Sequence, residues 1–138
     1  MILLDTNVLS EFTKARPSQA VEAWFDMQDI HELWTTTITE TELLIGLATM
    51  AEGRRKAELQ RAIDTMLNLF DDRILPFDRD AAREMPDVFL KRRRANLEPK
   101  LADCQIAAIA RAQGATVATR DMADFSHTGA KIINPWTA

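Results

Sequence analysis

The sequence predicts an α/β protein with three layers, in which a central, mainly parallel sheet of about five strands lies between two layers of helices. The chain begins with a short apolar run, residues 1–4, which is too short for a helix and ends abruptly at Asp5. Further β-branched and apolar segments alternate with helical patterns of ten or more residues. Strands separated by such helices pair in parallel, and helices cover both faces of their sheet.

The first half of the chain is expected to form two strands and three helices. Residues 33–38 are rich in threonine and include Trp34 and Ile38, a composition typical of a strand. Ser18 is a suitable N-cap for the second helix. The expected helices span residues 8–12, 18–27 and 39–50, and Gly53 separates the last of them from the next helix.

The second half is expected to add three strands and three helices. Asp78 is a suitable N-cap for a helix that begins at Arg79, although Pro86 lacks a backbone donor and should kink or interrupt this helix. Gly114 suits the left-handed conformation that often ends a helix. The expected helices span residues 54–70, 79–90 and 101–113, and the expected strands span residues 73–77, 115–119 and 131–134.

Length and composition indicate a single domain that covers residues 1–138. The net charge is −4, so a nucleic-acid partner would have to be bound by a local basic patch or through a metal ion. One cysteine, Cys104, excludes an internal disulfide framework and suits a reducing compartment. Because we find no secretion signal and no apolar segment of about 20 residues, we expect a soluble, cytoplasmic protein without membrane attachment.

Four carboxylates are expected at one edge of the predicted sheet. Asp5 follows the first strand, Glu42 lies in the first turn of the helix after the second strand, and Asp121 follows the fourth strand. Asp103 lies in the first turn of the helix that leads into the fourth strand, and this turn should reach the same edge because that helix runs antiparallel to the strand. Ligands bind at this edge in open α/β sheets.

A divalent cation would relieve the repulsion among these four groups. Carboxylates gathered in a partly dry site raise one another's pKa values unless a positive charge neutralises them. Carboxylate and water ligands suit Mg²⁺ or Mn²⁺, whereas zinc sites use histidine and cysteine. His31 and His127 lie far apart in apparent loops, and we interpret both as surface residues.

Two of these acids have an alternative, purely structural interpretation within their helices. Glu42 stands three residues after Thr39, which is the spacing of a capping box. Asp103 near a helix start gains from the helix dipole. Each structural interpretation is satisfactory alone, and only the joint placement of the acids favours a functional one.

The polar residues that follow the first and fourth strands could act as helix N-caps. Asp121 or Asp124 could cap a helical turn at residues 122–125. Asp5, Thr6 and Asn7 are all good N-caps for the first helix. Because Asp5 is assigned to the acidic cluster, we predict that capping is left to its two neighbours.

The basic run at residues 91–94, Lys-Arg-Arg-Arg, has two interpretations that the sequence leaves open. Lysine and arginine supply most contacts to phosphates, so the run could bind RNA. A solvated helix face explains it equally well. The aromatic residues Trp24, Phe25, Trp34 and Trp136 could contribute to subunit surfaces, but aromatic residues at helical or strand spacing more often belong to the core.

Five segments together resemble the PIN-domain proteins, specifically the VapC-type toxins of bacterial toxin–antitoxin pairs, including the FitB-like group. These segments are MILLDTNVLS at 1–10, TETELLIG at 39–46, ILPFD at 74–78, LADCQIAAIA at 101–110 and TRDMADF at 119–125. The resemblance covers essentially the whole chain, and the combination of segments is highly specific although no single segment is.

The resemblance implies a metal-dependent endoribonuclease that leaves a 5′-phosphate and a 3′-hydroxyl. Its catalytic acids and metal ligands would be Asp5, Glu42, Asp103 and Asp121. We expect Asp5 and Asp103 to bind Mg²⁺ or Mn²⁺ directly, and Glu42 and Asp121 to hold waters or a second ion. Whether Asp121 or the accessory acid Asp124 is the fourth ligand is left open. Supporting roles are expected for Thr6, Asn7 and Thr119, which would orient carboxylates, and for Arg120, which would contact a substrate phosphate.

The same resemblance implies the partners. We expect an RNA substrate, a small VapB-like antitoxin whose C-terminal segment fills the acidic groove, and a homodimer that could form a larger complex with the antitoxin. One alternative is a metal-binding or RNA-binding module without turnover. Another is a haloacid-dehalogenase-like phosphatase, whose motif needs a second aspartate where Asn7 stands; a receiver-type phosphoacceptor lacks its N-terminal acidic pair here.

Overall fold

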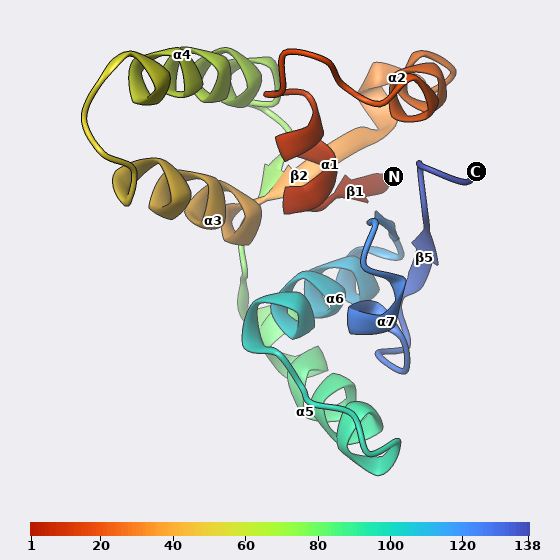
Figure 1. The fold of residues 1–138 in the computed structure, drawn as a ribbon. Helices are drawn as coiled ribbons and strands as arrows, with labels where there is room; N and C mark the ends of the chain where they lie inside the picture. The colour runs from red at the N-terminus through yellow and green to blue at the C-terminus, as the bar shows by residue number, and fades with distance from the viewer.

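The computed structural model describes all 138 residues (Figure 1). It contains a five-stranded parallel sheet in the order β3-β2-β1-β4-β5. Central strand β1 pairs through Leu3 with Trp34 of β2 and with Val117 of β4. The predicted parallel sheet is confirmed, with each strand shorter than expected. The strands are β1 Ile2–Leu4, β2 Leu33–Thr36, β3 Ile74–Leu75, β4 Thr116–Ala118 and β5 Lys131–Ile133.

Seven α-helices connect the strands, and a short 3-10 helix, η1 Ile30–Glu32, precedes β2. Gly114 ends α6 in the left-handed conformation with a φ of 65°, as expected. No helix has both the length and the apolar composition needed to cross a membrane. The helices are α1 Thr6–Glu11, α2 Gln19–Asp26, α3 Thr37–Ala48, α4 Arg54–Leu69, α5 Arg79–Arg94, α6 Leu101–Gln113 and α7 Met122–Phe125.

The sheet separates two apolar cores, because successive side chains of a strand point to opposite faces. Leu3 belongs to a core formed with α5, α6 and α7, whereas Leu4 belongs to a core formed with α1, α2, α3 and α4. Figure 1 shows these two groups of helices on opposite sides of β1. The predicted three-layer arrangement is therefore confirmed.

The four aromatic residues considered above contribute to these cores. Trp24 is buried, and Phe25 and Trp136 pack partly buried against the same core. Trp34 packs against the core on the other face. The core interpretation of these residues is confirmed.

Helix α3 begins earlier than its sequence suggests, which changes the position of Glu42. Thr36 is the N-cap, and its hydroxyl accepts a hydrogen bond from the backbone N–H of Thr39 at 3.2 Å. The alternative interpretation of Thr39 and Glu42 as a capping box is therefore wrong. Glu42 lies in the second turn rather than the first, where helix capping makes no demand on its carboxylate.

Helix α5 continues through Pro86, so the predicted interruption is wrong. A proline inside a helix removes one backbone hydrogen bond and crowds the preceding turn. Residues on both sides of Pro86 are anchored, since Ala81 and Val88 are buried in the core shared with α6. The carboxylate of Asp78 accepts from the N–H of Ala81 at 3.0 Å, so the predicted cap is present. Tertiary packing therefore outweighs the local cost of the proline.

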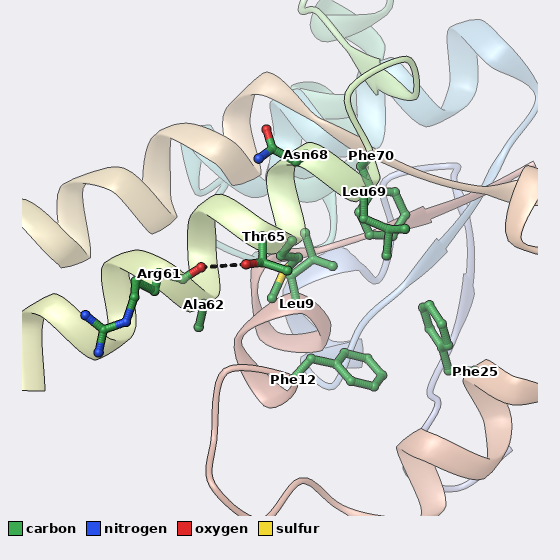
Figure 2. A pocket seen from close by; sticks show the side chains of 10 residues that line it. Leu9, Phe12, Phe25, Arg61, Ala62, Thr65, Asn68, Leu69 and Phe70 are labelled. Carbon is green, nitrogen blue, oxygen red and sulfur yellow. Dashed lines mark hydrogen bonds between the residues drawn. The ribbon is translucent and has the colours of Figure 1, made fainter.

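An apolar pocket of about 750 Å³ opens between α1, α2 and α4 (Figure 2). Phe12 and Phe25 meet across it with ring centroids 4.9 Å apart. Leu69, on the α4 side, is 53% exposed, so the pocket leaves a large apolar side chain in contact with solvent. The lining residues are Leu9, Phe12, Phe25, Arg61, Ala62, Thr65, Met66, Asn68, Leu69 and Phe70.

Candidate active site

The topological switch point of the sheet lies between β1 and β4. After β1 the chain adds β2 and β3 on one side, and it later adds β4 and β5 on the other. The backbone N–H of Asp5 donates to the carbonyl of Ala118 at 3.1 Å, which holds the ends of β1 and β4 together. Ligands bind outside the carboxyl ends of the strands at such a point. Asp5 and residues 119–121 are the first to follow these ends.

Asp5 both caps a helix and faces the other acids. It is the N-cap of α1, and its Oδ1 accepts from the backbone N–H of Val8 at 3.2 Å. The prediction that capping is left to Thr6 or Asn7 is therefore wrong. Only 4% of Asp5 is exposed. The cap and the end of β1 together fix the orientation of its carboxylate.

Burial raises the pKa of Asp5 from its ordinary value of 3.8 to about 6. The nearby carboxylate of Asp121 adds to this increase, whereas the hydroxyl of Thr119 and the backbone N–H groups of Val8 and Asn7 act in the opposite direction. These hydrogen-bond donors do not fully offset desolvation. The negative form of Asp5 therefore lacks a nearby compensating positive charge.

Asp103 reaches the same edge from the first turn of α6. Burial raises the pKa of Asp103 from 3.8 to about 6, and the carboxylates of Asp124 and Glu42 add to the increase. Asp121 contributes in the same direction, and Lys100 acts against it. Acids from α3, α6 and α7 are thus close enough to influence one another's ionisation.

Glu42 is held at this edge by a neighbour of Asp5. The hydroxyl of Thr6 donates to Oε1 of Glu42 at 2.8 Å, and it also lies 3.5 Å from the hydroxyl of Thr39. These contacts tie the start of α1 to α3. A threonine in this position therefore orients one carboxylate of the cluster.

Asp121 is held in the same way by the next residue of the chain. The side-chain amide of Asn7 donates to Oδ2 of Asp121 at 2.6 Å. The backbone N–H of Asp121 donates to the hydroxyl of buried Thr119 at 2.9 Å. Asp121 stands at the N-cap of α7 but makes no side-chain cap. Residues 5–7 thus supply one acid and orient two others.

Asp124, the acid within α7, has a basic partner that sequence analysis missed. Lys100 lies immediately before α6, and its Nζ is 3.0 Å from Oδ1 of Asp124. Asp124 is also the charged neighbour that raises the pKa of Asp103 most. Asp121 is thus associated with Asp5, and Asp124 with Asp103. Lys100 stands three residues before Asp103, and this spacing is the signal in the sequence that places this base near the acids.

Arg120 lies between Thr119 and Asp121 in the chain, but its side chain packs on Trp136. Its guanidinium is 5.3 Å from the centre of the Trp136 ring, a cation–π arrangement. It also contributes to lowering the pKa of Glu11, after the larger effects of Lys14 and of the Ser18 N–H. Arg120 is thus an exposed cation beside the acidic edge.

The donor set fits a hard divalent cation held by few protein ligands. No group of three or more histidine, cysteine, aspartate or glutamate side chains lies close enough to enclose an ion. Mg²⁺ typically uses one or two carboxylates together with waters and substrate phosphates. Asp5 and Asp103, whose ionisation is disfavoured by burial and by acidic neighbours, are the two carboxylates that such a cation would stabilise.

The raised pKa of Asp103 predicts an unusual pH dependence of stability in chelator. Because the folded state holds its proton up to about pH 6 and the unfolded state only to about 3.8, this group's contribution is complete below pH 3.8 and is lost as the pH rises through 6. Asp103→Asn removes this term. The free energy of unfolding of Asp103→Asn, relative to wild type, should therefore rise between pH 4 and 7 in urea titrations. A difference that stays constant over this range would contradict the assignment.

The histidines and the basic run are distributed differently from the acids. His31 and His127 are exposed, as predicted. Arg92 is buried, and its guanidinium donates to the carbonyls of Glu98 at 2.7 Å and Ala123 at 2.8 Å. Neither interpretation of the run therefore holds for Arg92, which joins α5 to the segments that carry the acids.

Comparison with known proteins gives consistent results. A model of the PIN domain matches residues 2–131. The chain is 44% identical over 137 residues to a protein named VapC ribonuclease Y4jK from Sinorhizobium fredii, covering 99% of this chain and 98% of that protein. It is 37% identical over 137 residues to a protein named Toxin FitB from Neisseria gonorrhoeae, covering 99% of each.

Solved structures show the same similarity. The crystal structure of FitAcB from Neisseria gonorrhoeae contains a chain with a TM-score of 0.92 and 37% identity, and the match covers both chains completely. A structure of FitAB bound to a DNA fragment matches with a TM-score of 0.91 and 36% identity over 99% of this chain and 96% of that one. VapBC-1 from nontypeable Haemophilus influenzae shares the fold, with a TM-score of 0.81 at 20% identity over the whole of both chains.

Proposed function

Because this chain belongs to the PIN-domain family and is related to the VapC and FitB toxins over nearly its whole length, we propose that it is a metal-dependent endoribonuclease, the toxin of a toxin–antitoxin pair. The observation that supports this most is the pair Asp5 and Asp103. Both carboxylates have a pKa raised to about 6 at the switch point of the sheet. A structural cap alone does not require a second desolvated acid whose pKa is raised by the same neighbour, Asp121.

Asp5 and Asp103 are the residues that would hold Mg²⁺ or Mn²⁺. Such an ion, when bound, would polarise the scissile phosphate and lower the pKa of an attacking water. Glu42 and Asp121 would accept hydrogen bonds from waters in the site. Their own positions depend on Thr6 and Asn7, which donate to them at 2.8 and 2.6 Å.

The neighbouring side chains suit a phosphodiester substrate. Arg120 is exposed beside the acids, and its stacking on Trp136 restricts its orientation, so we assign it a contact with a substrate phosphate. Thr119, which is fully buried, supports both Asp5 and the N–H of Asp121. Family resemblance indicates products with a 5′-phosphate and a 3′-hydroxyl.

The family match removes the phosphatase and phosphoacceptor alternatives. Asn7 also has a specific role in this site, since it donates to Asp121. A PIN-fold module that binds metal or RNA without turnover remains the second candidate. Incubating the purified chain with labelled RNA, in Mg²⁺ and in excess chelator, separates the two: cleavage confined to Mg²⁺ supports the enzyme, and intact RNA in both conditions supports the binding module.

The partner that we propose is a small antitoxin, since the similar solved structures are of FitAB and VapBC toxin–antitoxin complexes. The apolar pocket between α1, α2 and α4 offers a place for an apolar segment of such a partner (Figure 2). Leu69 and Phe12 at this pocket present the apolar surface. The antitoxin would bury this surface and extend from it toward the acids.

A homodimer remains a prediction. Leu44 and Ile45 on α3 are 43% and 58% exposed. Large apolar side chains that are this exposed on one helix are the ones that an interface between two copies would bury. They lie on the helix that carries Glu42, so such an interface would border the acidic edge.

A further inference from the structure

A basic hollow of about 520 Å³ lies beside the C-terminal end of α5. It is lined by Lys91, Arg94, Ala95, His127 and Gly129. Three of these five residues carry basic groups and none carries an acidic one. In a chain with a net charge of −4, such a cluster is a local exception.

Lys91 and Arg94, the two strong bases of the hollow, form no ion pair shorter than 3.8 Å. Lys91 is 3.8 Å from Asp87, which is long for a salt bridge. Asp87 accepts a shorter contact from Arg111, at 2.7 Å, and it is the one acid on which Arg111, Lys91 and Arg94 all act to lower its pKa. Arg94 is exposed and contacts no carboxylate directly, acting on Asp87 only at longer range. Both side chains are therefore available to an anion from solution.

The buried guanidinium of Arg92 adds an uncompensated positive charge next to the hollow. Only 3% of Arg92 is exposed, and its partners are the carbonyls of Glu98, Ala123 and Ser126 rather than a carboxylate. Ser126 directly precedes His127, which lines the hollow. These carbonyls stabilise the guanidinium by hydrogen bonding but leave its positive charge without a counter-ion, so an anion in the adjacent hollow would be favoured.

The helix dipole explains only part of this cluster. Basic residues are favourable in the last turn of any helix, and α5 ends with four of them. This effect does not account for His127, which comes from the separate segment after α7. Nor does it account for a hollow between the two segments.

We propose that this basic hollow binds a backbone phosphate of the RNA substrate at a distance from the cleaved bond; this proposal rests on the nuclease function proposed above. The lining contains no apolar side chain larger than that of Ala95, whereas protein partners usually require an apolar interface core. A single-stranded polyanion matches the charge and needs no such core.

The position of the hollow supports a continuous path to the acids. Arg92 donates to Ala123 and Ser126, at either side of the end of α7. The same short helix carries Asp124 and begins after Asp121. At about 1.5 Å per residue, this four-residue helix is only about 6 Å long. An RNA chain in the acidic site therefore needs to extend little beyond α7 to reach the hollow.

The test is the salt dependence of RNA binding by the full chain. Binding of a fluorescent single-stranded RNA of mixed sequence is measured in EDTA at several salt concentrations, for wild type and for Lys91→Ala/Arg94→Ala. For single strands the slope of log Kobs against log[salt] becomes less negative by about 0.7 for each phosphate that is no longer neutralised, so loss of this one phosphate site should reduce its magnitude by about 0.7. The matched control is Arg79→Ala/Arg83→Ala, which removes two exposed bases from the same helix and should leave the slope unchanged.

Equal slopes for the two double variants would overturn the proposal. It would also be overturned if Lys91→Ala/Arg94→Ala weakened binding of the antitoxin but left the RNA slope unchanged, since the hollow would then serve a protein. Binding in EDTA does not depend on turnover. If the salt slopes of wild type and Lys91→Ala/Arg94→Ala differ as expected but wild type never cleaves RNA in Mg²⁺, the nuclease function fails while the phosphate-binding hollow is supported.

Discussion

Asp5→Asn is expected to lower the rate of RNA cleavage by roughly a thousandfold or more while the fold is retained. The loss follows because a ligand of the catalytic ion contributes several kcal/mol to the transition state, and each ~1.4 kcal/mol is a factor of ten. The fold is retained because asparagine is as good an N-cap as aspartate and can still accept from the N–H of Val8. Single-turnover cleavage of labelled RNA in Mg²⁺ measures the effect.

Asp64→Asn is the matched control for this variant. Asp64 is an exposed acid on α4 that forms no ion pair, so its replacement makes the same chemical change away from the acidic edge. It should cleave RNA at the wild-type rate. Near-wild-type activity of Asp5→Asn, with Tm unchanged, would show that Asp5 is only a helix cap.

Arg92→Met is expected to destabilise the protein by about 3 kcal/mol, which corresponds to a fall in Tm of about 10 °C for a domain of this size. Methionine can replace the apolar part of the side chain but donates no hydrogen bond. The carbonyls of Glu98, Ala123 and Ser126 then lose a charged donor in a buried site. Cleavage should fall as well, because these carbonyls belong to the segments that hold Lys100 and Asp124. Thermal unfolding followed by circular dichroism measures the stability change.

The neighbouring arginine provides the comparison. Arg93 is exposed, and its guanidinium lies 5.7 Å from the ring centre of Phe89. Arg93→Met should change stability by no more than about 0.5 kcal/mol, as is usual for surface positions. If both variants have the same Tm, the buried hydrogen bonds of Arg92 contribute little, and the link between α5 and α7 must depend on other contacts.

Much of the fold could be predicted because it depends on local patterns. The apolar run before Asp5 and the threonine-rich segment before α3 identify strands, and Gly114 identifies the end of a helix. The start of α3 could not be located, because Thr36, Thr37 and Thr39 are all capable of ending a strand or capping a helix. Only the pairing of β2 with β1 and β3 selects Thr36.

The acidic site was less predictable because its contacts join distant residues. That the acids share one edge follows from strand order, which the alternating pattern indicates. The hydrogen bonds of Thr6 with Glu42 and of Asn7 with Asp121 span 36 and 114 residues of sequence, and no local rule predicts them. Arg92 illustrates the same limit, since sequence cannot distinguish a buried arginine from its exposed neighbours in a basic run.

The most direct test of a metal-dependent hydrolytic site is the chemistry of the RNA ends produced in Mg²⁺ and in excess EDTA. If water attacks the RNA phosphorus in the site formed by Asp5 and Asp103, the products in Mg²⁺ should carry 5′-phosphates and 3′-hydroxyls. No products should form in EDTA, and cleavage activity should recover fully when Mg²⁺ is restored. Cleavage that continues at the same rate in EDTA, or products with 2′,3′-cyclic phosphates and 5′-hydroxyls, would contradict this site as the origin of the activity.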